Sequence, residues 1–204
     1  MTTSDAVPVL PVAVPLGVAV LVLLLLRLGR RGRLTWPRAA VAGAVALYSA
    51  GVFANTVFPV HLHPVTSGAP WTPHLVLVPF VDYEVGDALM NAGVFAPLGV
   101  LIPLLMRRPS GWSVLLLAAA TSLGIELTQL AAQAFFAGGH IADVNDLIWN
   151  VAGGMVGYGA YALATRAPSI SRLLARFRWH DPVVAGQPGP PLQLGVQSKT
   201  GLHL

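Results

Sequence analysis

Five apolar segments, each roughly 20 residues long, constrain this chain more than any other feature of its sequence. A helix needs about 20 residues to cross the hydrocarbon core of a bilayer. Because the backbone must satisfy its own hydrogen bonds in that core, each segment is predicted to be a helix. The predicted spans are residues 8–26, 39–60, 88–106, 112–136 and 147–165.

The composition excludes the other broad classes of protein. Hydrophobic residues make up 55% of the chain and charged residues only 10%, whereas about 25% of an ordinary soluble domain is charged. Disordered chains have low hydrophobicity and high charge, the opposite balance. Without cysteine, disulfides, thiolate metal sites and cysteine nucleophiles are excluded. We therefore expect an all-α, multi-pass protein of the cell membrane.

The basic residues predict the orientation of these spans. All 12 lysines and arginines lie between the first and second segments, between the third and fourth, or after the fifth. The positive-inside rule places these regions in the cytoplasm. Five spans then put the N-terminus outside and the C-terminus inside. The sequence pI of about 10.1 thus reflects flanks that attract anionic membrane lipids, and we expect no nucleic-acid partner.

Three regions follow from this pattern. Residues 1–68 would form two N-terminal spans with an arginine-rich cytoplasmic loop. Residues 69–165 would form a core of three spans, preceded at 75–80 by an interfacial or re-entrant segment. Residues 166–204 would form a basic cytoplasmic tail, with a short helix at 169–179 on the membrane surface and disorder beyond Pro182.

Polar side chains form stripes at helical spacing within the apolar segments. Ionisable groups inside a span cost several kcal/mol unless they are paired or hydrated, and Glu126 lies midway along the fourth segment. The stripe on that segment is Ser122, Glu126, Gln129 and Gln133. The stripe on the fifth is Asp143, Asp146, Asn150, Gly153 and Gly157. With Asn91 on the third segment and Tyr48 and Asn55 on the second, these stripes predict an outward-facing polar cavity with Glu126 at its floor.

Eight residues are candidate ligand-binding residues of this cavity: Asn91, Ser122, Glu126, Gln129, His140, Asp143, Asp146 and Asn150. No complete catalytic motif is present, so catalytic residues are left unassigned, with Glu126, Asp143 and Asp146 as candidates. The alternative is structural: Glu126 as a neutral buried carboxyl, the two aspartates as helix caps, and the asparagines as contacts between helices. The histidines at 61, 63, 74 and 140 show no specific metal-binding spacing, so no metal or cofactor is expected.

Three segments that carry the polar stripes, and a weaker fourth element, resemble the motifs of a known family, the VanZ-like bacterial membrane proteins. Residues 91–99 are similar to Asn-x-x-x-Phe-x-Pro-Leu-Gly, and residues 122–129 to Ser-x-x-Ile-Glu-x-x-Gln. Residues 143–158 resemble Asp-x-x-Asp-x-x-x-Asn-x-x-Gly-x-x-x-Gly-Tyr, and residues 77–80 match a weaker Leu-x-Pro-Phe element. Two positions depart from the family pattern: His140 replaces an arginine, and Val76 replaces an asparagine.

The resemblance implies an envelope protein that lowers sensitivity to glycopeptide antibiotics such as teicoplanin. We expect its cavity to bind a lipid, a cell-wall precursor or a lipoglycopeptide. Two alternatives stay open: an intramembrane enzyme that acts on a lipid-linked substrate with Glu126 as general base, and a small transporter. A homo-oligomer also stays open, because five helices are few for a transporter.

Overall fold

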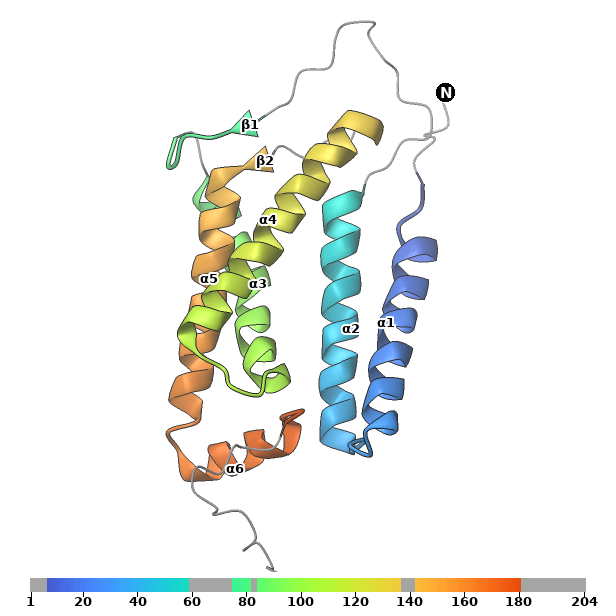
Figure 1. Ribbon diagram of the computed structural model, residues 1–204. Helices are drawn as coiled ribbons and strands as arrows, with labels where there is room; N and C mark the ends of the chain where they lie inside the picture. Colours follow the sequence, from blue (N-terminus) through green and yellow to red (C-terminus); the bar gives the residue numbers. More distant parts are fainter. Residues whose placement is uncertain (1–6, 59–74, 82–83, 137–141, 181–204) are drawn as a thin grey trace, which may run out of the picture.

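The structure, a computed structural model, is described for residues 7–58, 75–81, 84–136 and 142–180. This part contains six helices and one pair of two-residue strands (Figure 1). The elements are α1 (Leu10–Arg30), α2 (Trp36–Val57), β1 (Leu75–Val76), α3 (Val85–Leu105), α4 (Gly111–Phe136), β2 (Ala142–Asp143), α5 (Val144–Ala164) and α6 (Pro168–Phe177). The all-α prediction is confirmed, and the first five helices correspond to the five predicted segments.

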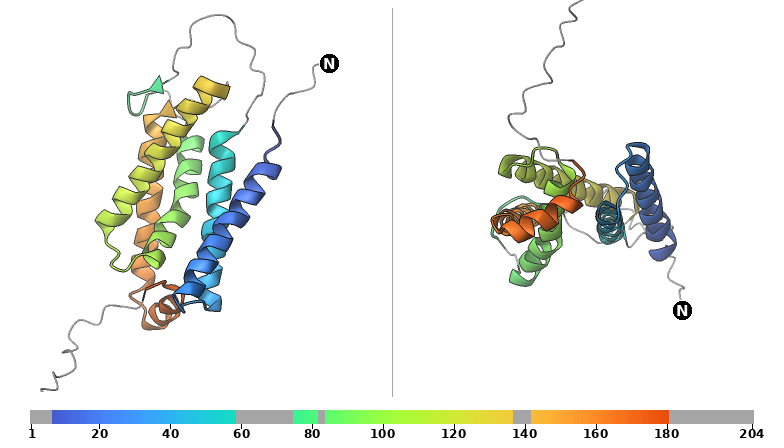
Figure 2. Two further views of the ribbon diagram at one scale, coloured as in Figure 1. Left: turned by 45° about the vertical axis from the view of Figure 1, so that its right-hand side comes forward. Right: turned by 90° about the horizontal axis from the view of Figure 1, so that it is seen from below.

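The long helices form two groups. Helices α1 and α2 form an antiparallel hairpin, and α3, α4 and α5 form a second group beside it (Figure 1). The short α6 lies across the end of the bundle where α5 finishes, as the view from below shows (Figure 2). The strands β1 and β2 pair in parallel, with Leu75 opposite Ala142 and Val76 opposite Asp143. This pair ties the segment before α3 to the start of α5.

Helices α3 and α5 pack with their backbones in close contact. A Cβ atom added at Gly153 would overlap the backbone of Ala92, and one added at Gly157 would overlap the backbone of Ala96. Small residues four positions apart form one face of a helix and allow this approach. The glycines of the fifth segment thus hold α5 against α3, and this contact positions the polar first turns of α5.

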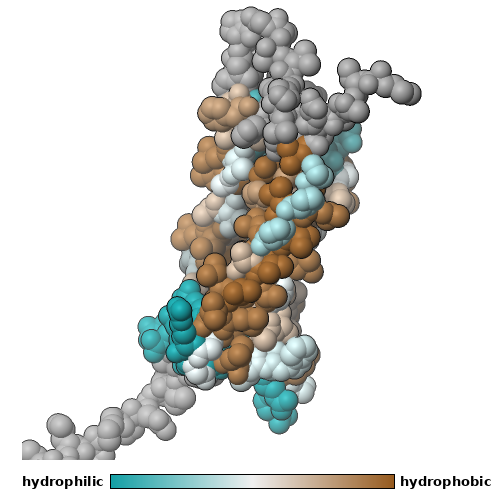
Figure 3. Space-filling model, turned by 90° about the vertical axis from the view of Figure 1, so that its right-hand side faces the viewer, coloured by the Kyte–Doolittle hydropathy of each residue, from teal (hydrophilic) through white to brown (hydrophobic). Residues whose placement is uncertain are grey.

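Among the described residues, α1, α2, α3 and α4 are long and apolar enough to cross a membrane. Helix α5 has 21 residues but is less apolar, because its first turns contain Asn145, Asp146 and Asn150. Many large apolar side chains are exposed on the bundle, and they form a broad band in the space-filling view (Figure 3). Hydrophilic residues gather at its lower end, where α1 ends and α2 begins. This banded surface is typical of a membrane bundle.

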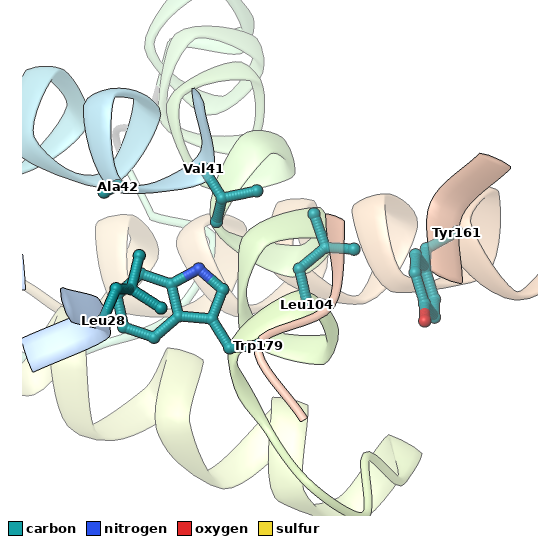
Figure 4. Close-up of a cluster of buried hydrophobic side chains, with 6 residues drawn as sticks. All are labelled: Leu28, Val41, Ala42, Leu104, Tyr161 and Trp179. Atoms are coloured by element: carbon teal, nitrogen blue, oxygen red, sulfur yellow. The ribbon is translucent and has the colours of Figure 1, made fainter. Parts of the chain in front are cut away.

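The segment after α6 joins both helix groups at the arginine-rich end. Trp179 is 8% exposed and belongs to a cluster with five other buried residues (Figure 4). Its members are Leu28, Val41, Ala42, Leu104, Tyr161 and Trp179. The backbone N–H of Trp179 donates to the Leu104 carbonyl at 2.9 Å, and the guanidinium of Arg178 donates to the Tyr161 hydroxyl at 2.6 and 2.9 Å. The tail therefore contributes to the core beneath α1, α2 and α3.

The structure adds detail to the predicted regions. The helix predicted at 169–179 is present as α6, which ends at Phe177, and Trp179 beyond it is buried. The place of α6 on the membrane surface stays a prediction. The predicted disorder beyond Pro182 lies outside the described residues. The division into 1–68, 69–165 and 166–204 stays a prediction.

Candidate functional site

A cavity of about 420 Å³ lies between α2 and the group formed by α3, α4 and α5. It sits toward the end of the bundle opposite the arginines, because it is lined by the last turns of α2 and the first turns of α3 and α5. Its polar lining residues are Tyr48, Asn55, Thr56, Asn91, Glu126, Gln129, Asp146 and Asn150. The polar stripes of four helices therefore converge on one space.

Glu126 is oriented by the start of α5. The backbone N–H of Asp143 donates to Glu126 Oε2 at 2.8 Å, and the side chain is only 7% exposed. The second oxygen, Oε1, is buried and accepts no hydrogen bond from any described residue. The carboxyl group is therefore held through one oxygen, while the acceptor capacity of the other is not used by any described residue.

Two further polar atoms at the cavity have no partner within the described part. They are Gln129 Oε1, one turn from Glu126 on α4, and the hydroxyl of Tyr48 on α2. Most buried polar atoms in proteins are paired, and those that are not indicate a ligand or water. Three buried oxygens without a partner in the described part thus belong to residues that line one cavity, which makes it the candidate site.

Asn91 and Asp146 connect α3 to α5 at the rim of the cavity. Asn91 Nδ2 donates to Asp146 Oδ1 at 2.6 Å, and both residues line the cavity. A hydrogen bond from an amide to a carboxylate is stronger than a hydrogen bond between two neutral groups. This pair fixes the direction in which Asp146 presents its carboxylate.

Exchanging these two residues tests that geometry. Asn91→Asp is expected to lower the thermal stability of the purified protein, because it places two carboxylates against each other at hydrogen-bond distance. Asp146→Asn keeps an amide oxygen that can accept the Asn91 N–H and is expected to lower the thermal stability less. The double variant Asn91→Asp/Asp146→Asn restores an amide and a carboxylate and should recover stability beyond the sum of the single effects. Additive single effects would show that the contact does not form.

The other predicted site residues have structural partners. Ser122 is fully buried, and its Oγ accepts a 3.0 Å hydrogen bond from Asn150 Nδ2. The side chain of Asp143 caps α5 by accepting from the Asn145 N–H at 2.8 Å. Neither Ser122 nor Asp143 is among the residues that line the cavity. The remaining candidate, His140, lies outside the described residues.

Two polar residues near the site were not expected from the sequence. Thr56, on the last turn of α2, lines the cavity. Asn145 Oδ1 accepts the Phe80 N–H at 2.7 Å, which stabilises the positive φ of 62° at Phe80. The signal for Asn145 was its place between two aspartates at a helix start, where short polar side chains bind neighbouring backbone.

An apolar groove lies beside the polar cavity. Its volume is about 410 Å³, and it runs between α2, α3 and α4. Four residues line both spaces: Tyr48, Val52, Thr56 and Ile125. The rest of the groove is lined mainly by Leu, Val and Phe side chains. A polar space and an apolar space therefore lie next to each other between α2 and the helices α3 and α4.

Within the described part, no group of three or more His, Asp or Glu residues is arranged to hold a metal ion. The predicted histidines at 61, 63, 74 and 140 lie outside that part.

Comparison with known families places the site in context. The family model described as VanZ/LLP1 matches residues 45–165, which include every polar residue of the cavity. This match confirms the resemblance drawn from the sequence motifs. Neither the search of curated proteins nor the search of solved structures found a match to the chain.

Proposed function

Since the chain belongs to the VanZ/LLP1 family of membrane proteins, we propose that it binds an amphiphilic component of the cell envelope in the cavity between α2 and α3–α5. The candidate ligands are a membrane lipid, a lipid-linked cell-wall precursor and a lipoglycopeptide. Each has a polar part with hydroxyl or amine donors and a long apolar part.

One observation carries the proposal: the polar cavity lies beside an apolar groove, and the two share four lining residues. Glu126 Oε1, Gln129 Oε1 and the Tyr48 hydroxyl supply acceptors for the polar part. The groove between α2, α3 and α4 supplies a surface for an acyl or isoprenyl chain. Among the described residues that line the cavity there is no arginine or lysine, so hydroxyl and ammonium groups fit it better than a phosphate does.

We also propose that five helices span the membrane with the cavity on its outer side. Helix α5 is as long as α3, and its polar first turns contact α3 and α4 instead of lipid. All described arginines lie at the other end of the bundle, which the positive-inside rule places in the cytoplasm.

Single cysteines test this orientation, because the chain has no cysteine of its own. Glu84→Cys and Arg108→Cys change exposed residues just outside the two ends of α3. A membrane-impermeant maleimide is expected to label Glu84→Cys in cells with an intact cytoplasmic membrane and Arg108→Cys only after that membrane is permeabilised. The reverse pattern would show that the cavity faces the cytoplasm.

Native mass spectrometry of the purified protein tests for the ligand. The wild type is expected to retain an amphiphile in mild detergent, and Val94→Trp is expected to lose it, because Val94 lines the cavity and tryptophan fills that space. The matched control is Leu127→Trp, whose exposed side chain faces away from the cavity on α4. Equal amounts of bound amphiphile in the two variants would contradict the proposal.

A second candidate function, an intramembrane enzyme, is favoured by the geometry of Glu126. One carboxylate oxygen is held by the Asp143 N–H while the other is buried without a partner in the described part, and a carboxyl group fixed through one oxygen in this way can be oriented as a general base. This reading predicts that Glu126→Gln stops turnover of a lipid-linked substrate that the variant still binds. Loss of binding in the variant would favour the binding function alone.

A further inference from the structure

A second polar site lies at the opposite end of the bundle, where the chain gathers its arginines. A cavity of about 190 Å³ opens there between the end of α1, the end of α3 and the segment after α6. Three guanidinium groups and one imidazole line it, those of Arg27, Arg31, Arg33 and His180. Its size suits one phosphate group with a few waters.

The fold brings these four side chains to one cavity. Arg27 and Arg31 are four residues apart at the end of α1 and therefore share one face. The guanidinium of Arg33 donates to the backbone carbonyl of Trp179 at 2.9 Å, and the backbone N–H of Trp179 donates to the Leu104 carbonyl. The tail is thereby fixed against α3, which brings His180 to the arginines. No hydrogen bond or ion pair within the described part holds Arg27 or Arg31.

The charge around the cavity is positive. None of its lining residues is acidic, and the described carboxylates lie in the middle or at the other end of the bundle. Burial lowers the pKa of His180 below its usual 6.5, and the arginines at 33, 31, 107 and 27 lower it further. Asp181, the next residue, lies outside the described part. Cations brought together in this way favour an anion between them.

We propose that this cavity binds the phosphate group of an anionic phospholipid. Guanidinium groups bind phosphate oxygens through paired N–H donors. Leu24 and Leu105 form an apolar wall of the same cavity, where the first part of an acyl chain can lie. Basic pockets between membrane helices are known to hold lipid headgroups. The site is separate from the polar cavity and does not depend on the function proposed for it.

Titration of the purified protein with phosphatidylglycerol, followed by native mass spectrometry, tests the site. Phosphatidylcholine is the reference lipid. Arg27→Gln/Arg31→Gln is expected to weaken phosphatidylglycerol binding about tenfold or more. The matched control, Arg172→Gln/Arg176→Gln, removes the same charge from α6 outside the cavity and is expected to stay close to wild type. Size-exclusion profiles check that both variants fold.

Competition with inorganic phosphate identifies the source of the anion. If inorganic phosphate does not displace phosphatidylglycerol, the site recognises a lipid headgroup together with its chains. If inorganic phosphate does displace it, the site binds phosphate and free phosphate can also fill it. Equal weakening in the two double variants would overturn the proposal, since only diffuse surface charge would then be at work. A lack of preference for phosphatidylglycerol over phosphatidylcholine would overturn it as well.

The pH dependence of binding gives a second measurement on folded protein. A bound phosphate favours the charged imidazole, so phosphatidylglycerol should bind more tightly as the pH falls through the lowered pKa of His180. Among the described residues, the other charges facing His180 come from arginines 27, 31, 33 and 107, which do not titrate in this range. His180→Gln is expected to remove the pH dependence. An unchanged pH profile in this variant would contradict a role for His180 in the site.

Discussion

Gly157→Ala is expected to destabilise the protein, although alanine is the better helix former. The added Cβ would overlap the backbone of Ala96 on α3, and a backbone cannot rotate away as a side chain can. Overpacking of a core costs about 1–3 kcal/mol, against a gain of about 1 kcal/mol from helix propensity. The thermal midpoint of the detergent-purified protein should fall, and less of the protein should elute as a single species in size exclusion.

Gly159→Ala is the matched control on the same helix. A Cβ at Gly159 would meet no atom within 4 Å, so the same substitution should leave stability unchanged or slightly higher. A Gly157→Ala protein as stable as Gly159→Ala would show that α3 and α5 are not in backbone contact. Because that contact aligns Asn91 with Asp146, such a result would also remove the basis for the cavity.

Glu126→Gln is expected to abolish ligand binding while the protein still folds. The amide oxygen of glutamine can accept the Asp143 N–H as Oε2 does, so the anchor is retained. The amide N–H₂ then replaces the unpaired Oε1, which turns an acceptor into a donor and removes the negative charge. Loss of one charge-assisted hydrogen bond corresponds to about tenfold or more in affinity.

The cellular consequence can be measured in a strain that lacks the gene. Wild type is expected to restore tolerance to a lipoglycopeptide and Glu126→Gln to fail, with both present in the membrane. Glu84→Gln is the matched control, since Glu84 is exposed before α3 and lines no cavity. Full complementation by Glu126→Gln would show that the carboxylate is structural in this chain.

The helices could be predicted from the sequence because apolar length alone decides them. Even so, α1 extends through Arg27 to Arg30, beyond the predicted apolar span. Long arginine side chains can reach the membrane surface from within a helix, so the apolar span ends before the helix does. Helix α5 was predicted correctly as a helix, but its polar first turns make it less apolar than the other four.

The polar stripes predicted which helices meet at the candidate site and not what each residue does there. Glu126, Gln129 and Asp146 line the cavity as expected. Ser122 belongs to the same stripe as Glu126, but its hydroxyl accepts a hydrogen bond from Asn150. The stripe extends along α4 beyond the part of the helix that lines the cavity. Helical spacing predicts on which face of a helix a residue lies, but it does not predict which part of that face lines the cavity.

Two other contacts between distant segments could not be predicted from the sequence. The pairing of β1 with β2 involves two residues on each side, which is too short for a strand pattern. The burial of Trp179 beneath α1 and α2 depends on where α6 ends relative to α3. Each of these contacts joins residues far apart in the sequence, and spacing within one segment carries no information on them.

Site-specific photo-crosslinking in the native membrane tests the central claim most directly. A benzophenone amino acid at Val52 would sit on the wall shared by the cavity and the groove, and one at Leu47 would sit on the exposed side of the same helix. The binding account predicts one enriched amphiphile at Val52, lost in Glu126→Gln, and the bulk lipid mixture at Leu47. The bulk lipid mixture at both positions would contradict it.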